Sequence, residues 1–517
     1  MKNVLRAKLR CVSPNFEPAP VTVLFNSYAF LLAFLPASVL IFYGLRLAGF
    51  ERASLLALVL LSVAFYGYWN PRYLLLLVPL TFFNFAIASG VLAYRVQQPL
   101  AARMLLIAGI TTNLGALGYF KYANFFVDNL NSLLKVDIAL ATIVLPLGIS
   151  FFTFQKIAFI VDAYRGRVDR LNLLDFSLFV SFFPQLIAGP IVHHAEVLPQ
   201  FRRQKCTAGR DIVQGATIFA IGLAKKVLIA DTVAIYAAPG FDAAANGVGL
   251  DPLSAWSAAL AYTAQLYFDF SGYSDMAIGA ALLFGIRLPV NFASPYKASS
   301  IIDFWRRWHI TLSRFLREYL YVPMGGNRHG PSRRYVNLLL TMLLGGLWHG
   351  AGWTYVVWGA LHGAYLVINH GWRTVRERLV WMPRTVGPLE FHLGQALTFV
   401  AVVVGWVCFR SSSIDSAARM LRAMAGANGF GTSPPLVQSA EALVVIVACL
   451  LVAWFAPNTQ EVMAYEGPFG NAEHRPIREG SGRNWQPTMR WALLIGCLIG
   501  ISLMSLSKVS EFLYFQF

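Results

Sequence analysis

His349 is the side chain whose sequence neighbours best suit acid–base chemistry. It lies in the stretch LLGGLWHGAGW (Leu343–Trp353), after an apolar run and between pairs of glycines. Glycine lets backbone or substrate approach closely, and imidazole needs only a small pKa shift to act as a general base. The alternative interpretation, a histidine that only packs, stays open at this point. No metal site is expected, because neither a histidine nor a carboxylate lies three or four positions from His349.

A second histidine, His309, lies in a strongly basic stretch, Ile302–Leu320. Large apolar residues recur there every three or four positions, which predicts a basic amphipathic helix at the membrane surface. Its arginines can contact lipid headgroups or, alternatively, hold the phosphates of an anionic cofactor. On the second interpretation the candidate cofactor-binding residues are Arg306, Arg307, Arg314 and Arg317.

The stretch QLYFDFSGYSD (Gln265–Asp275) places polar and ionisable residues between two apolar runs, Leu253–Phe268 and Asp275–Leu288. Ionisable residues at membrane depth are functional candidates by default. A helix-start cap followed by a satisfied polar network explains the pattern equally well. The residues concerned are Asp269, Ser271, Tyr273, Ser274 and Asp275.

Two stretches have prolines that break apolar helices, Leu145–Gly148 and Pro184–Pro190. Irregular backbone at membrane depth is tolerated only when it is buried in protein or lines a cavity. The two stretches are therefore packing kinks or the wall of a substrate tunnel.

These residues belong to a chain built for a bilayer. Of its 517 residues 57% are hydrophobic and 13% charged, against about a quarter charged in soluble proteins. Long apolar runs predict an all-α polytopic membrane protein with about 11 transmembrane helices plus re-entrant and interfacial pieces. The net charge of +17 is assigned to membrane orientation and anionic lipids rather than to nucleic acid. The five cysteines form no pattern typical of disulfides or zinc.

Cations in the early loops predict the orientation. The first, third and fifth loops hold seven Lys and Arg residues against three in the second and fourth, so the odd loops are expected in the cytoplasm. Four cations before the first apolar run contradict this orientation. We therefore expect residues 1–22 to be an extension, with translation starting at Val21 or Val23.

Several long motifs in this chain together resemble the membrane-bound O-acyltransferases, in particular the bacterial branch that O-acetylates alginate, with D-alanine-exporting relatives. The likeness runs from about Val23 to Trp372 and more weakly beyond. The motifs are DFWRRWH (Asp303–His309), YVPMGGNR (Tyr321–Arg328) and GGLWHG (Gly345–Gly350), supported by Phe65–Pro71, Leu145–Gln155, Phe182–Pro190 and Gln265–Asp275.

The resemblance implies a helical ring around a central tunnel, with His349 as the essential histidine and His309 as the second one. It implies an acyl group that arrives from the cytosol, with acetyl-CoA as the donor and no tightly bound cofactor, and an acceptor hydroxyl from the other side. Partner acetyltransferases in the periplasm then serve an exopolysaccharide such as alginate, which places the chain in the bacterial inner membrane. No role is assigned to His193, His194, His329, His362, His370, His392 or His474.

The expected organisation is an acyltransferase core over 23–372, followed by loops and about three transmembrane helices over 373–517. Two other functions fit the apolar spans: a transporter or flippase for a polysaccharide or lipid intermediate, and a non-catalytic scaffold of a secretion complex. The pair His309 and His349 beside a basic surface favours the acyltransferase, because a transporter has no particular need for it.

Overall fold

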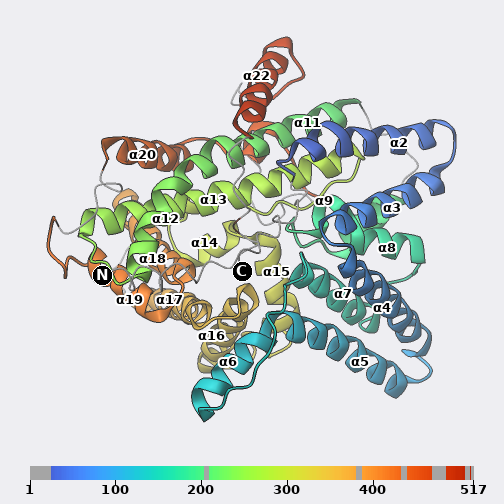
Figure 1. The fold of residues 1–517 in the computed structure, drawn as a ribbon. Coiled ribbons are helices and arrows are strands. Elements are labelled where there is room, and N and C mark those ends of the chain that lie inside the picture. The colour runs from blue at the N-terminus through green and yellow to red at the C-terminus, as the bar shows by residue number, and fades with distance from the viewer. Residues whose placement is uncertain are drawn as a thin grey trace, which may run out of the picture.

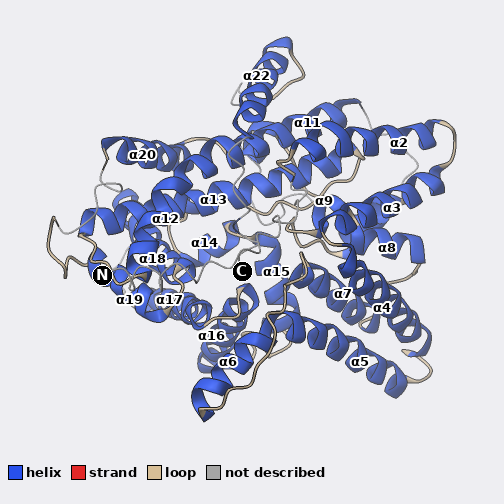
Figure 2. Ribbon diagram, viewed as in Figure 1, coloured by secondary structure: helices blue, strands red, loops and turns tan. Residues whose placement is uncertain are grey.

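The computed structural model describes residues 25–202, 209–379, 387–431, 439–468, 485–506 and 513. The expected extension, the start at Val21 or Val23, and His474 lie outside the described residues. Within them the regular structure is helical and contains no strand (Figure 2). In chain order the helices are η1 (Ala29–Phe34), α2 (Leu35–Leu47), α3 (Glu51–Trp69), η2 (Pro71–Tyr73), α4 (Leu74–Tyr94), α5 (Pro99–Leu117), η3 (Gly118–Tyr122), α6 (Ala123–Leu134), α7 (Ile149–Tyr164), α8 (Leu173–Ser181), α9 (Phe183–Leu186), α10 (His194–Phe201), α11 (Gly209–Ala224), η4 (Lys225–Ala230), α12 (Asp231–Ala245), α13 (Pro252–Leu283), η5 (Pro295–Lys297), α14 (Ile301–Arg307), α15 (Ile310–Leu316), η6 (Arg317–Tyr321), α16 (Gly330–His349), α17 (Trp353–Arg378), α18 (Pro388–Arg410), α19 (Ile414–Met424), α20 (Ala440–Phe455), α21 (Thr459–Met463) and α22 (Met489–Ser505).

The apolar helices fit a membrane. Among the described residues, five helical stretches are long and apolar enough to cross one, and two further apolar helices are shorter. This confirms the all-α polytopic class, while the number of spans, expected at about 11, stays a prediction. The five are Ala29–Leu47, Glu51–Trp69, Pro71–Tyr94, Pro99–Leu134 and Pro388–Arg410.

Helix α13 crosses the middle of the molecule, and the other helices group on its two sides (Figure 1). Helices α11 and α12 pack along it, while α4, α5 and α7 form one lateral group and α16, α17 and α18 another. The short helices α14 and α15 lie between these groups (Figure 1). The residues singled out in the sequence therefore meet near the centre of the fold.

Gln265–Asp275 lies inside one helix, which corrects the expectation of two runs with a helix start between them. Helix α13 is continuous over 32 residues and its N-cap is Asp251, whose carboxylate accepts from the Ser254 N–H. Gly272 and Gly279 allow the backbone of α11 to pass close by: a Cβ on Gly279 would lie 2.5 Å from the amide nitrogen of Phe219. The close packing of α13 against α11 depends on those glycines.

The prediction of a single amphipathic surface helix over Ile302–Leu320 is wrong. The segment forms α14, α15 and η6, and the break falls at His309, which has a positive φ of 43°. Trp305 and Trp308 are only 9% and 3% exposed, so they pack inside the protein rather than at the membrane interface. The cause is a preceding extended segment: the Asn291 carbonyl accepts from the Ile310 N–H at 3.0 Å and so ends the helix there.

Candidate active site

The structure brings together the two histidines that the sequence singled out. His309 lies at the break between α14 and α15, and His349 is the last residue of α16. Their ring centroids are 6.4 Å apart, and the residues are 0% and 5% exposed. Two imidazoles that are separated by forty positions in the sequence therefore share one buried site.

Hydrogen bonding fixes the tautomer of His309. Its Nδ1 lies 3.1 Å from Asn291 Oδ1, which also accepts from the Thr311 hydroxyl at 2.9 Å. An amide oxygen only accepts hydrogen bonds, so Nδ1 must carry the proton. In the neutral ring Nε2 then keeps its lone pair and acts as an acceptor. His309 is thus suited to accept a hydrogen bond from a hydroxyl, and it donates through Nε2 only when doubly protonated.

Aromatic rings enclose His349. Trp348, Trp358 and Phe409 lie with their ring centroids 5.0, 5.1 and 5.3 Å from the imidazole, each in an edge-to-face arrangement. Such walls exclude water, and an electrostatic interaction is stronger in a dry, low-dielectric site. The indole N–H of Trp358 is buried and has no hydrogen-bond partner among the described residues, so it is available as a donor.

His362, to which the sequence assigned no role, packs against Trp358. Its ring centroid is 4.8 Å from that of Trp358, and neither ring nitrogen has a hydrogen-bond partner in the described part of the chain. A Cβ on Gly405 would lie 2.8 Å from His362 Nε2. The glycine therefore makes room for this imidazole behind the wall of the site.

Glycines hold α16 against α17 at this corner. A Cβ on Gly346 would overlap the carbonyl oxygen of Tyr355, and a Cβ on Gly350 would overlap the Tyr355 ring. The glycines around His349 therefore permit a close helix–helix approach. The sequence indicated close approach but not which backbone approaches.

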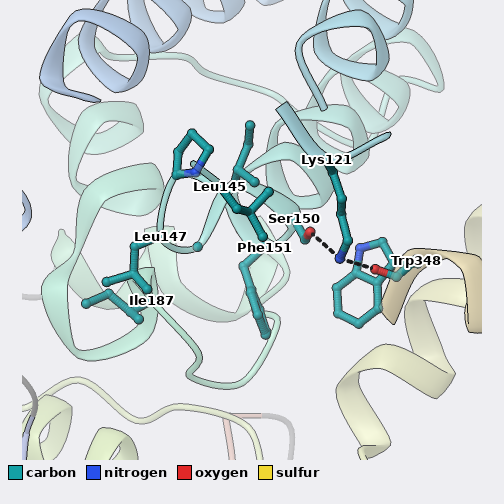
Figure 3. A pocket seen from close by; sticks show the side chains of 10 residues that line it. Lys121, Leu145, Leu147, Ser150, Phe151, Ile187 and Trp348 are labelled. Carbon is teal, nitrogen blue, oxygen red and sulfur yellow. Dashed lines mark hydrogen bonds between the residues drawn. The ribbon is translucent and has the colours of Figure 1, made fainter. Parts of the chain in front are cut away.

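A pocket lies beside Trp348, the residue before His349, and combines the two proline-broken stretches (Figure 3). One wall is the loop and first turn of α7, Leu145–Phe151; the others include Ile187, Lys121 and Trp348. The interpretation of these stretches as the wall of a substrate path is thus the one that this geometry favours. Trp348 lines the pocket, and its ring centroid lies 6.2 Å from that of His309 and 5.0 Å from that of His349.

Sequence reasoning missed Lys121, which it counted only as a loop cation. Lys121 Nζ donates to the carbonyl oxygens of Trp348 at 2.6 Å and His349 at 2.9 Å (Figure 3 draws the first). Ser150 Oγ lies 3.4 Å from the same nitrogen. No local signal could have revealed these contacts, because more than 220 residues separate the lysine from Trp348 and His349.

The four arginines proposed to bind a cofactor fall into two pairs. Arg307 donates to Asp303 at 3.0 Å, and Arg314 forms a bidentate pair with Glu196 at 2.6 and 2.8 Å. Arg306 and Arg317 have exposed side chains. Two of the guanidinium groups are therefore paired with carboxylates, at Arg307 and Arg314.

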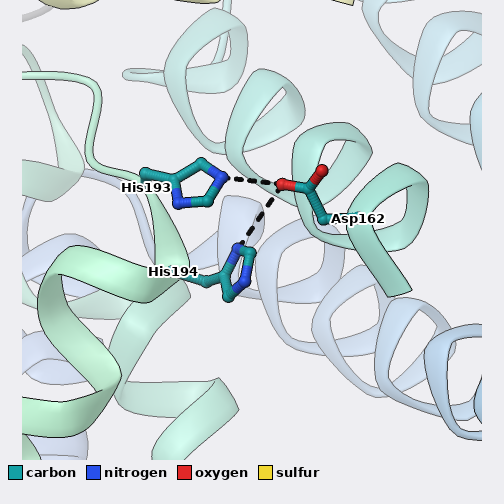
Figure 4. A group of neighbouring side chains, drawn as sticks. All are labelled: Asp162, His193 and His194. Carbon is teal, nitrogen blue, oxygen red and sulfur yellow. Dashed lines mark hydrogen bonds and ion pairs between the residues drawn. The ribbon is translucent and has the colours of Figure 1, made fainter. Parts of the chain in front are cut away.

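A further cluster joins the end of α7 to α10 and η6 (Figure 4). Asp162 Oδ2 accepts from His193 Nε2 at 2.7 Å and from the Tyr319 hydroxyl at 2.5 Å, and His194 Nδ1 lies 3.6 Å away. Burial, and to a smaller extent the neighbouring His193, lower the pKa of His194 to about 4. Asp162 and the two histidines have the donor types of a metal site, but Arg167 lies 3.3 Å from Oδ1 and competes with any cation there.

The two carboxylates in the Gln265–Asp275 stretch of α13 belong to ion pairs. Asp269 pairs with Lys226 at 2.7 Å. Asp275 accepts from Lys225 at 2.7 Å, Thr459 at 2.6 Å and Gln460 at 2.8 Å. Of the two interpretations of Gln265–Asp275, the satisfied polar network is confirmed for these two carboxylates.

Comparison with known proteins identifies the relatives of this chain. Residues 139–389 match the profile of the membrane-bound O-acyltransferase family. The chain is 40% identical to a peptidoglycan O-acetyltransferase of Helicobacter pylori, over 96% of this chain and 98% of that protein. It is also 40% identical to the "Probable alginate O-acetylase AlgI" of Pseudomonas aeruginosa, over 96% and 100%. A teichoic acid D-alanyltransferase of Bacillus subtilis is 27% identical over 51% of this chain and 67% of that protein.

Proposed function

Because this chain belongs to the membrane-bound O-acyltransferase family, we propose that it moves acetyl groups from cytoplasmic acetyl-CoA across the bacterial inner membrane for O-acetylation of a cell-envelope polysaccharide. The observation that carries the proposal is the buried pair His309 and His349 inside an aromatic enclosure. Acetyl-CoA is a substrate here, and no tightly bound cofactor is invoked.

His349 is the general base in this proposal. A hydroxyl is a poor nucleophile until its proton is removed, and His349 takes that proton as the oxygen attacks the thioester carbonyl. The C–S bond then breaks, and the proton passes from His349 to the departing thiolate. General-base catalysis contributes about 10²–10⁴-fold, and His309 orients the hydroxyl through its acceptor Nε2.

The developing oxyanion needs a donor, and the Trp358 indole is the one that the geometry suggests. The Trp358 ring lies beside His349, and its N–H is buried without a described partner. A fixed donor in a dry site stabilises transition-state charge at no reorganisation cost. Neutral His309 is less suited to this task, because its Nδ1–H is used by Asn291.

Helix α7 supports access from two sides. Its 16 residues span about 24 Å. Ser150 in its first turn lines the pocket beside Trp348, while Asp162 near its end contacts Tyr319 of η6. We propose that the acceptor enters through the pocket and that the donor phosphates meet the basic surface at the other end. That surface consists of Arg306, Arg307, Arg314 and Arg317.

The acceptor is proposed to be small. The pocket is lined by ten residues, and the described residues form helices and their connections, without a separate sugar-binding domain. A polymer strand would have to enter this narrow space at every modified sugar. A small carrier, or one protruding hydroxyl on a periplasmic partner acetyltransferase, fits better and would pass the acetyl group to the polymer.

The relatives favour an acyltransferase over a transporter or a scaffold, since those compared above are named as transferases or acetylases. They do not choose the polymer. One relative at 40% identity is named for peptidoglycan and another at the same identity for alginate. The proposal therefore extends to a cell-envelope polysaccharide as a class.

The decisive experiment uses purified protein in vesicles, with radiolabelled acetyl-CoA on the cytoplasmic face. We expect acetyl-CoA turnover by wild type and at least about 10²-fold less by His349→Ala. Label should reach added polysaccharide only when the periplasmic partner is present. Efficient labelling of the polymer without a partner would overturn the relay, and equal turnover by the two proteins would overturn the role of His349.

A further inference from the structure

Helix α16 ends at a place where its own sequence cannot hold His349 in position. His349 is the last helical residue, and Gly350 is extended with φ −158° and ψ 153°. The following residues are Ala351 and Gly352. A segment of small residues gives little conformational restraint of its own. The orientation of the imidazole therefore depends on contacts that come from outside α16.

Those contacts come from η3, which joins α5 to α6. Lys121 donates to the carbonyls of Trp348 and His349 at 2.6 and 2.9 Å, and the Tyr122 hydroxyl donates to the carbonyl of Leu347 at 2.7 Å. Three consecutive carbonyls of the last turn are thus bound by two consecutive side chains. A helix leaves its final carbonyls without partners inside the helix, and at membrane depth an unsatisfied carbonyl is costly.

The charge of Lys121 suits this position. The C-terminal end of a helix carries partial negative charge, which a nearby cation stabilises. Lys121 Nζ also lies 5.9 Å from the centre of the Trp348 ring, within cation–π range. Residues Gly118–Tyr122 form a π-helical turn, a local widening that is frequent at functional sites.

We infer that Lys121 is the positioning residue for the proposed base: its ammonium clamps the carbonyls of Trp348 and His349 and thereby fixes the imidazole toward His309. This inference rests on the proposed function of His349. Lys121 does not transfer a proton in it. Tyr122 assists by holding the carbonyl one residue earlier, without charge.

The test is a kinetic comparison in vesicles, with acetyl-CoA concentration varied and turnover measured. Lys121→Met keeps the length of the side chain and removes the three N–H donors. Small misplacements of catalytic groups can cost about 10²-fold in rate. We therefore expect kcat to fall by about 10–100-fold, with KM for acetyl-CoA unchanged. Lys121→Arg keeps charge and donors and should restore most of the activity. Tyr122→Phe should lower kcat less than Lys121→Met does. The matched control is Lys135→Met, the same change at an exposed lysine after α6.

His349→Ala is measured in parallel, alone and with Lys121→Met. If His349→Ala is inactive while Lys121→Met keeps wild-type kcat, the clamp is overturned and the role of His349 stands. If His349→Ala is fully active, the proposed function itself fails. Adding Lys121→Met to His349→Ala should lower residual turnover no further, because the clamp acts through His349; an additional tenfold loss would overturn the inference. Should Lys121→Met accumulate poorly, Lys121→Gln is measured per folded protein, and wild-type kcat there would likewise overturn it.

Discussion

The charged cluster of α13 and the histidine pair look alike in the sequence and differ in the fold. Both consist of ionisable residues in apolar segments. In α13, Asp269 and Asp275 meet lysines at 2.7 Å, so each charge is neutralised by a partner. His309 and His349 meet aromatic rings and each other.

The charged residues of α13 therefore stabilise the packing of helices, whereas the two histidines are suited to catalysis. A paired buried charge ties two helices together, and removing one partner leaves the other charge uncompensated. An imidazole in an aromatic enclosure is suited to exchange a proton with a substrate, because its pKa is near neutral. Substitutions in the two regions should therefore affect different observables: protein stability in α13, and turnover at the histidines.

The largest expected effect is that of His349→Ala. The variant should accumulate in the membrane as wild type does, while acetylation is lost, by at least about 10²-fold. The side chain removed is of modest volume and lies at the last residue of α16 among aromatic rings, so its loss leaves packing largely intact. Radiolabel incorporation per amount of membrane protein measures this, and wild-type acetylation would remove His349 from the mechanism.

Lys226→Met should show the opposite pattern. Lys226 is 2% exposed and lies 2.7 Å from both Asp231 and Asp269, so its loss leaves two buried carboxylates without their cation, at a cost of about 3–5 kcal/mol. We expect poor accumulation and a lower melting temperature in detergent. Glu390→Gln is the control, because it removes an exposed pair with Arg376, worth about 0–1 kcal/mol. If both substitutions lower the melting temperature equally, the distinction fails.

His309→Ala should lower turnover by about 10–100-fold, less than His349→Ala, because it removes orientation rather than the base. His309→Gln keeps a hydrogen-bonding side chain but cannot titrate. We expect it to recover part of the activity when turnover is measured per folded protein. A glutamine variant as inactive as the alanine variant would show that His309 must take up and release a proton during turnover.

The smallest expected effect is the difference between alanine substitutions at two neighbouring glycines, Gly345 and Gly346. Gly346→Ala would force the added Cβ against the Tyr355 carbonyl, whereas at Gly345 the Cβ would meet only the end of the Leu316 side chain at 3.1 Å. Overpacking against backbone costs about 1–3 kcal/mol, and a flexible side chain can move aside. The melting temperature and turnover of Gly346→Ala should both fall below those of Gly345→Ala. Equal values would mean that α16 and α17 can separate locally.

Much of this protein could be predicted from composition and motif. Low charge and long apolar runs determine the all-α membrane class, since hydrocarbon admits only helices or closed barrels. Local motifs identified His309 and His349, and the resemblance gave the family that the comparisons confirm. The surface helix over Ile302–Leu320 was predicted wrongly. Its large apolar residues do recur with helical spacing, but Asn291, eighteen residues before His309, contacts that histidine, and the helix ends there.

Tertiary structure alone decided which ionisable residues are paired and which face each other. Hydrophobic periodicity in the sequence indicates that a residue is buried, but it does not say what that residue contacts. A buried aspartate in an ion pair and a buried histidine among aromatic rings therefore look the same in the sequence. The partners of Asp275 include Thr459 and Gln460, and those of Lys121 include the backbone of His349. Contacts across such separations are fixed by helix packing, which brings together residues that no local pattern in the sequence relates.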